Sequence, residues 1–173
     1  MKIICAMVSS LDGKITKGDS SNIYEWTSPE DQNYFADLIK SNNLIVMGSA
    51  TFDAVKPKPQ KNKLRIVLTR SPQKYSEFAV SGQLEFTSET PPELVNRLDK
   101  QYQHMLLVGG GKINTLFFKA GLVDELWLTL EPKILGKGKN IISENDLDIR
   151  LQLVESKNLN DQGTLLLKYK VLQ

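Results

Sequence analysis

The alternation of apolar and polar residues along the chain predicts strands and helices that follow one another in turn. A nearly continuous apolar run over residues 2–8 indicates a buried strand, and the polar stretch 9–24, which contains two glycines, indicates a long loop. Ser28-Pro29-Glu30-Asp31 is typical of a helix start, with Ser28 as the cap and Asp31 three residues later. Apolar residues then recur at helical spacing from Tyr34 to Ile39.

Short apolar strands continue along the chain, most of them followed by a turn or a helix. We expect further strands over residues 44–47, 64–68, 84–86, 105–108 and 123–130, and helices over 49–55, 91–100 and 112–120. Residues 151–156 and 164–172 are separated only by a turn, which favours an antiparallel pair. The pattern predicts one α/β domain over residues 1–173, with a mixed, mostly parallel central sheet and an antiparallel C-terminal strand pair.

The composition is that of an ordinary globular chain and excludes several functional classes. Hydrophobic residues make up 40% of the sequence, charged residues 24%, and the net charge is +2. This charge argues against a nucleic-acid partner, and no apolar run approaches the ~18 residues of a membrane span. With one histidine, His104, and one cysteine, Cys5, we expect no metal site and a buried, reduced thiol. Without a signal-peptide pattern, we expect a cytoplasmic protein.

Three turns fall where parallel strands should end, which is where open α/β sheets bind ligands. Gly109-Gly110-Gly111-Lys112 joins a strand to a helix, so that its backbone amides could receive a pyrophosphate. Gly48-Ser49-Ala50-Thr51 is a second turn of this kind, although Ser49 is also an ordinary helix cap. Thr69-Arg70-Ser71 offers a guanidinium and two hydroxyls to a phosphate monoester. For each turn, the alternative is a connection that binds no ligand.

Two acids are candidates for contact with a substrate or for proton transfer. Asp12 lies in the Leu11-Asp12-Gly13 turn, and Asp31 lies early in the first predicted helix. The structural alternatives are a turn residue for Asp12 and a partner of the helix dipole for Asp31. Trp26 could form the floor of a ring-binding pocket or could simply pack in the core.

Several segments together resemble the dihydrofolate-reductase-like superfamily, and above all the C-terminal reductase domain of the bacterial riboflavin-biosynthesis deaminase-reductase. They are Ser10-Leu11-Asp12-Gly13-Lys14-Ile15, Trp26-Thr27-Ser28-Pro29-Glu30-Asp31, Val46-Met47-Gly48-Ser49 with Thr51-Phe52, Ala120-Gly121-Leu122-Val123-Asp124-Glu125-Leu126 and Pro132-Lys133-Ile134-Leu135-Gly136. The match runs from about residue 3 to residue 171.

This resemblance implies a dihydrofolate-reductase-like three-layer fold, NADPH as the hydride donor and a homodimer. By the match, the pyrophosphate would be held by Gly109, Gly110, Gly111, Lys112 and Ile113, with help from Gly48, Ser49 and Thr51. Thr69, Arg70 and Ser71 would hold the adenosine 2′-phosphate, and Ala6, Ile15 and Trp26 would lie near the nicotinamide. Asp31 falls near the helix position of the acid that binds the pterin ring in dihydrofolate reductases.

The leading functional hypothesis is NADPH-dependent reduction of 5-amino-6-(5-phosphoribosylamino)uracil or a similar small molecule, by hydride transfer to the ribosyl C1 carbon. Asp12 or Asp31 would hold the heterocycle or assist protonation. One alternative is a reductase of the dihydrofolate or dihydropterin type. The other is a nucleotide-binding module of the same fold without turnover.

Overall fold

Eight strands form one sheet in the computed structural model, which describes residues 1–172. The strands are β1 (Lys2–Ser10), β2 (Leu44–Gly48), β3 (Leu64–Leu68), β4 (Leu84–Thr87), β5 (His104–Leu107), β6 (Glu125–Glu131), β7 (Arg150–Asn158) and β8 (Leu165–Leu172). The α-helices are α1 (Pro29–Ser41), α2 (Ser49–Val55), α3 (Pro91–Leu98) and α4 (Gly111–Lys119), and two 3-10 helices are η1 (Ile23–Glu25) and η2 (Pro72–Phe78).

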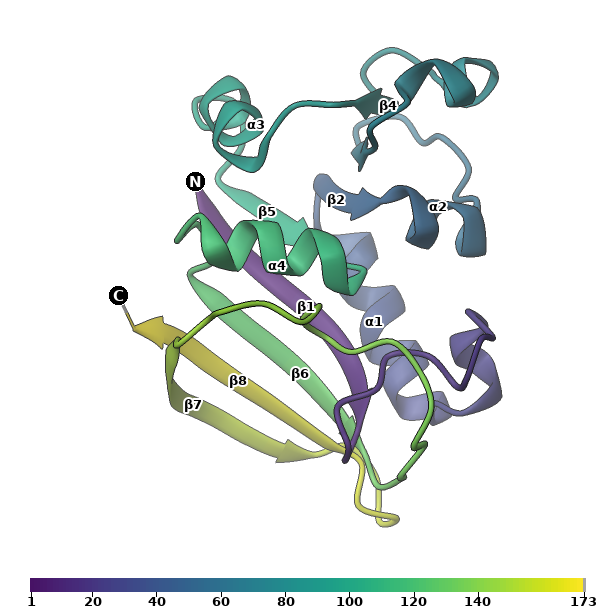
Figure 1. The fold of residues 1–173 in the computed structure, drawn as a ribbon, viewed down its shortest axis with the longest axis vertical. Helices are drawn as coiled ribbons and strands as arrows, with labels where there is room; N and C mark the ends of the chain where they lie inside the picture. Colours follow the sequence, from purple (N-terminus) through teal and green to yellow (C-terminus); the bar gives the residue numbers. More distant parts are fainter. Residues whose placement is uncertain (173) are drawn as a thin grey trace.

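The strand order across the sheet is β4-β3-β2-β5-β1-β6-β8-β7 (Figure 1). The pairs from β4 to β6 are parallel, whereas β8 runs antiparallel to both β6 and β7. Because β5 lies between β2 and β1, the chain moves outward to β4 and then returns to the centre of the sheet. The ends of β2 and β5 therefore become neighbours. The mixed sheet with an antiparallel C-terminal pair is confirmed.

Helices cover both faces of the sheet and create two cores. On one face, Leu38 of α1 and Phe52 of α2 pack with strand residues such as Ile45. On the other face, the apolar residues of α3 and α4, among them Leu94 and Phe117, pack with their own set of strand residues. Every residue of β2 and β3 is buried, as expected for parallel strands that are covered on both sides.

The structure departs from the predicted elements mainly at their ends. β1 continues to Ser10, two residues into the predicted loop, because it pairs with β6 along this whole stretch. The last parallel strand begins at Glu125 and ends at Glu131, instead of covering residues 123–130. The two 3-10 helices are too short to produce a helical periodicity in the sequence. η1 is held by its cap, since the Asn22 side chain accepts a hydrogen bond from Tyr24 N at 3.1 Å.

The single cysteine and the single histidine lie on β1 and β5, two paired strands. Cys5 is fully buried in β1, and this burial raises the pKa of its thiol to about 12, so that the thiol remains protonated. His104 is the exposed first residue of β5. Within residues 1–172, no helix is long and apolar enough to cross a membrane. No group of three His, Cys, Asp or Glu side chains in the same part of the chain could hold a metal ion.

Candidate functional site

The glycine turn between β5 and α4 brings its backbone close to two other segments. Gly109 has a φ of +82°, a conformation that suits glycine, and a β-carbon there would lie 2.9 Å from Met7 Sδ. A β-carbon on Gly111 would collide with the carbonyl oxygen of Asn140. The peptide bond between Gly109 and Gly110 is cis. The geometry of this turn is therefore specific to glycine at both Gly109 and Gly111.

The turn after β2 is hydrogen-bonded directly to this glycine turn. Gly48 N donates to Gly109 O at 2.8 Å, and a β-carbon on Gly48 would lie 2.6 Å from Ile113 Cγ1. A β-carbon on Gly110 would lie 3.6 Å from Thr51 Oγ1. The two turns predicted to hold one pyrophosphate thus lie side by side.

Both turns present the N-terminus of a helix. Gly48 is the N-cap of α2 and Gly110 is the N-cap of α4, and neither helix has a hydrogen bond from a capping side chain. The first amides of a helix lack intrahelical acceptors and carry the positive end of the helix dipole. Two neighbouring helix ends without side-chain caps can therefore donate several N–H groups to one anion, so the residues fit a pyrophosphate.

The third predicted contact lies one strand further out. β3 is the parallel neighbour of β2, with Leu68 opposite Gly48, so Thr69 follows directly at the same edge of the sheet. Thr69 Oγ1 accepts a hydrogen bond from Ser71 N at 3.3 Å, and the Arg70 side chain is exposed. The guanidinium is accessible to an anion that lies across the ends of β2 and β3.

The residues predicted to lie near a nicotinamide are buried. Ala6 and Trp26 are both 2% exposed, and Ile15 is 8% exposed. Ile15 lies beside the glycine turn, since a β-carbon on Gly110 would be 4.0 Å from Ile15 Cδ1. The Trp26 carbonyl accepts from Lys133 Nζ at 2.7 Å. The buried Nε1 of Trp26 has no hydrogen-bond partner among the described residues.

Asp31 lies in the first turn of α1 and is only 3% exposed. Ser28 caps the helix, since its Oγ accepts from Asp31 N at 3.3 Å, as the sequence predicts. Burial raises the pKa of the Asp31 carboxyl to about 6. The hydrogen bond with the Thr129 side chain on β6 lowers this pKa, and the nearby charge of Glu131 raises it. Such a carboxyl can exchange a proton near neutral pH.

Asp12 is held by three donors from the protein itself. Its Oδ1 accepts from Ser10 Oγ at 2.6 Å and from Leu135 N at 3.0 Å, and its Oδ2 accepts from Gly136 N at 2.7 Å. The bond from Ser10, followed by that from Leu135, lowers the pKa of Asp12 to about 2. The carboxylate therefore joins the loop after β1 to the loop after β6.

Further bonds continue this connection between the two loops. Leu11 N donates to Lys133 O, Gly18 N to Lys137 O, and Ile15 N to Lys139 O, each at 2.8 Å. The predicted long loop is thus pinned along residues 10–18 to residues 133–141, and this pairing holds Ile15 near the glycine turn.

Two residues near Asp31 were not predicted as site residues. Thr129 and Glu131 lie two positions apart on β6, so both face α1, and each is 2% exposed. The sequence does contain a signal for them. In a strand that alternates between buried and exposed residues, a polar residue at a buried position must find a hydrogen-bond partner nearby. The prediction stopped this strand at Leu130 and therefore left Glu131 outside it.

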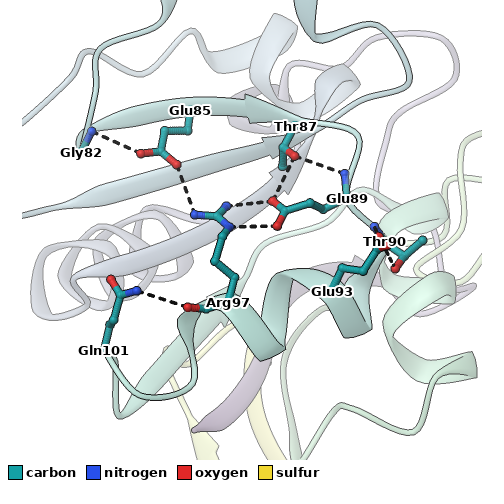
Figure 2. A network of polar contacts seen from close by, with 8 residues as sticks. All are labelled: Gly82, Glu85, Thr87, Glu89, Thr90, Glu93, Arg97 and Gln101. Carbon is teal, nitrogen blue, oxygen red and sulfur yellow. Dashed lines mark hydrogen bonds and ion pairs between the residues drawn. The ribbon is translucent and has the colours of Figure 1, made fainter.

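A hollow of about 530 Å³ lies between β4 and α3, away from the glycine turns, and is lined in part by Glu85, Glu89 and Arg97. Figure 2 shows how these three side chains meet. Arg97 donates to both carboxylate oxygens of Glu89, at 2.9 and 2.8 Å, and forms an ion pair with Glu85 at 3.6 Å. These contacts tie α3 to β4 and pair the charges that line the hollow.

Comparison with known proteins places this chain in a family. Residues 1–165 match the model of the RibD C-terminal domain. The chain is 28% identical over 170 residues to the uncharacterized protein YyaP of Bacillus subtilis (strain 168), and this alignment covers 92% of the chain and 89% of YyaP.

Two solved structures share the architecture. One is a diaminohydroxyphosphoribosylaminopyrimidine deaminase/5-amino-6-(5-phosphoribosylamino)uracil reductase from Thermotoga maritima, with a TM-score of 0.73 at 16% identity, covering 98% of this chain and 56% of that one. The other is the dihydrofolate reductase of Enterococcus faecalis complexed with NADP(H), with a TM-score of 0.72 at 20% identity and coverage of 99% and 97%. At these identities the similarity establishes the fold, and the predicted dihydrofolate-reductase-like fold is confirmed.

The raised pKa of Asp31 predicts a stability that falls as the pH rises. The folded carboxyl has a pKa of about 6 against an ordinary value of 3.8, so the unfolded chain ionises first and the free energy of unfolding decreases between these two values. Asp31→Asn removes this ionisation. It should unfold like the parent near pH 4 and be more stable above pH 7, by up to about 3 kcal/mol.

Denaturant unfolding at a series of pH values measures this difference. Asp37→Asn is the matched control, because Asp37 lies on the same helix and is exposed. The control should keep the pH dependence of the parent. If Asp31→Asn also kept it, the raised pKa of Asp31 would be wrong.

Proposed function

Because this chain belongs to the RibD C-terminal domain family, we propose that it is an NADPH-dependent reductase of an aminopyrimidine substrate, of the 5-amino-6-(5-phosphoribosylamino)uracil type. The observation that carries the proposal is the hydrogen bond from Gly48 N to Gly109 O, which sets two helix N-termini without side-chain caps side by side. The uracil reductase activity of the Thermotoga maritima neighbour supports the choice of substrate, and the NADP(H) in the Enterococcus faecalis neighbour supports the choice of cofactor.

The residues that would hold NADPH follow the edge of the sheet. The amides of the two glycine turns, with Thr51 Oγ1, would receive the pyrophosphate, and Thr69, Arg70 and Ser71 would receive the 2′-phosphate. Ile15 would cover the cofactor from the pinned loop. When bound, NADPH supplies the hydride.

The substrate side would be built around Asp31 at the start of α1. Its buried carboxyl, together with Thr129, would bind the polar edge of the heterocycle and fix the distance of the ring from the cofactor. The burial of Ala6, Ile15 and Trp26 would keep water away from the reacting carbon. Asp12 would act indirectly, by holding the loop that carries Ile15.

A second candidate is a reductase of the dihydrofolate or dihydropterin type. The observation that favours it is the buried acid itself, because a carboxyl paired with a threonine hydroxyl can recognise the adjacent amino and ring nitrogens of a pterin. Both candidates would use the same cofactor site and differ in the substrate that Asp31 would contact.

The first test is binding and turnover with purified protein. We expect NADPH to bind, as measured by fluorescence or calorimetry, and to be oxidised when 5-amino-6-(5-phosphoribosylamino)uracil is added, as followed by its absorbance. Dihydrofolate and dihydropterin assayed in parallel distinguish the second candidate. Binding without oxidation of NADPH by any member of this panel would favour a nucleotide-binding module, and absence of NADPH binding would overturn both proposals.

Arg70 should determine the preference for NADPH over NADH. A charge-assisted contact with the 2′-phosphate contributes roughly 1.5–3 kcal/mol, so Arg70→Ala should weaken NADPH binding about 10- to 100-fold and leave NADH binding unchanged. Calorimetry with both nucleotides measures this ratio. Lys100→Ala is a suitable control, because Lys100 is exposed and lies before β5, at the opposite end of the parallel strands. An unchanged preference in Arg70→Ala would remove Arg70 from the site.

We also propose that the chain forms a homodimer through β7, the last strand in the sheet order. β7 exposes apolar side chains, with Leu153 at 52% and Val154 at 66%. Val154→Lys should shift the protein toward monomer in analytical ultracentrifugation. Val55→Lys changes a similarly exposed valine on α2, at 59%, and should leave the assembly unchanged. A monomeric parent, or an unaffected Val154→Lys, would contradict the proposal.

A further inference from the structure

Glu131, the last residue of β6, is a buried acid whose partners are both uncharged. It is 2% exposed, its Oε1 accepts from Ser28 N at 2.7 Å, and its Oε2 accepts from Thr164 Oγ1 at 3.1 Å. Because both oxygens accept hydrogen bonds, the group has the bonding pattern of a carboxylate. Burying a charge without a cation is costly, so its position calls for a role beyond packing.

Hydrogen bonds connect Glu131 to Asp31 through the helix cap. Glu131 holds the backbone N–H of Ser28, and the Ser28 hydroxyl accepts from Asp31 N. Thr164, 1% exposed, anchors the other oxygen of Glu131 just before β8. The start of α1 is thereby fixed against β6 and β8, and the depth of the Asp31 carboxyl is fixed with it.

We propose that Glu131 is a positioning residue for Asp31: by binding the N–H of Ser28 it fixes the first turn of α1, and with it the place of the Asp31 carboxyl. The effect on turnover rests on the proposed function, in which Asp31 contacts the substrate. The effect on the proton of Asp31 does not depend on that function.

The electrostatics around Asp31 agree with this geometry. Burial raises the pKa of Asp31, Thr129 lowers it through a hydrogen bond, and the charge of Glu131 raises it further. Tyr34 lies one turn further along α1. Burial, followed by the charges of Glu155 on β7 and of Asp31, raises the pKa of Tyr34 to about 12. The ammonium of Lys133 is directed to the Trp26 carbonyl.

A proton on Asp31 would change what the carboxyl can recognise. The protonated group offers one O–H donor and one acceptor, whereas the ionised group accepts only. A donor beside an acceptor complements the edge of a pyrimidine that presents a carbonyl next to a ring N–H. We infer that Glu131 biases the site toward this type of edge, and away from rings that present two donors.

The test is a carbon-13 NMR titration of the side-chain carboxyls. Glu131→Gln keeps the size of the side chain and removes the charge. Its amide oxygen can accept from Ser28 N as in the parent, and its amide nitrogen can donate to Thr164 Oγ1, which reverses the direction of that bond. The midpoint of the Asp31 titration should move to lower pH. Glu77→Gln removes an exposed charge from η2, far from Asp31, and should leave the midpoint unchanged. An unchanged midpoint in folded Glu131→Gln would overturn the proposal.

A measurement on the parent protein covers the case in which Glu131→Gln does not fold. The Ser28 N–H should exchange slowly with solvent, because it is donated to the buried Glu131 carboxyl. Rapid exchange of this amide in the folded parent would also overturn the proposal.

The pH dependence of turnover then tests the consequence for the reaction. If a protonated Asp31 is required, kcat/KM for NADPH oxidation should decline at lower pH in Glu131→Gln than in the parent, while a purely structural loss would lower the rate at every pH. An unshifted profile together with a shifted NMR midpoint would contradict the proposed role of Asp31 in the reaction and would leave the positioning by Glu131 intact.

Discussion

The hydrogen bond from Gly48 N to Gly109 O governs the edge of the sheet that carries the candidate site. It requires the turns after β2 and β5 to approach so closely that a side chain at Gly48 would meet Ile113, and one at Gly109 would meet Met7. Some of these glycines are also the N-caps of α2 and α4, so the first amides of both helices lack side-chain caps, and relative to a serine or asparagine cap this costs each helix a few tenths of a kcal/mol. An anion that accepts hydrogen bonds from these N–H groups would offset this cost. The close approach of the two turns and their capacity to bind an anion therefore both depend on the glycines.

Local features of the sequence predict most of the fold and part of the site. Apolar runs identify the parallel strands, and the cap at Ser28 and the glycine turns follow from rules that act over a few residues. The contact between the two turns could not be predicted in this way, because it depends on the insertion of β5 between β2 and β1. Periodicity gives the order of elements along the chain and does not give their order across the sheet.

Asp31, Glu131 and Asp12 show more clearly that local patterns do not predict contacts between distant segments. Asp31 is correctly placed at a helix start, but the polar groups that act on its carboxyl, Thr129 and Glu131, come from a distant strand. The predicted strand ends at Leu130, one residue before β6 ends. Glu131 therefore falls in a predicted loop, although it is a buried residue of the strand. For Asp12, the turn is visible in the sequence, but the two amides after β6 that hold it are not.

The segment that leaves β6 connects the two halves of the site. Within a few residues, Glu131 fixes the start of α1, Lys133 binds the carbonyl of Trp26, and the amides of Leu135 and Gly136 bind Asp12. Further along, the Lys139 carbonyl holds Ile15 beside the glycine turn. A displacement of this segment would move Asp31 together with Ile15, the residue that would cover the proposed cofactor. The spacing between a substrate ring and the cofactor is thus set by one continuous stretch of backbone, and the charge of Glu131 lies at its beginning.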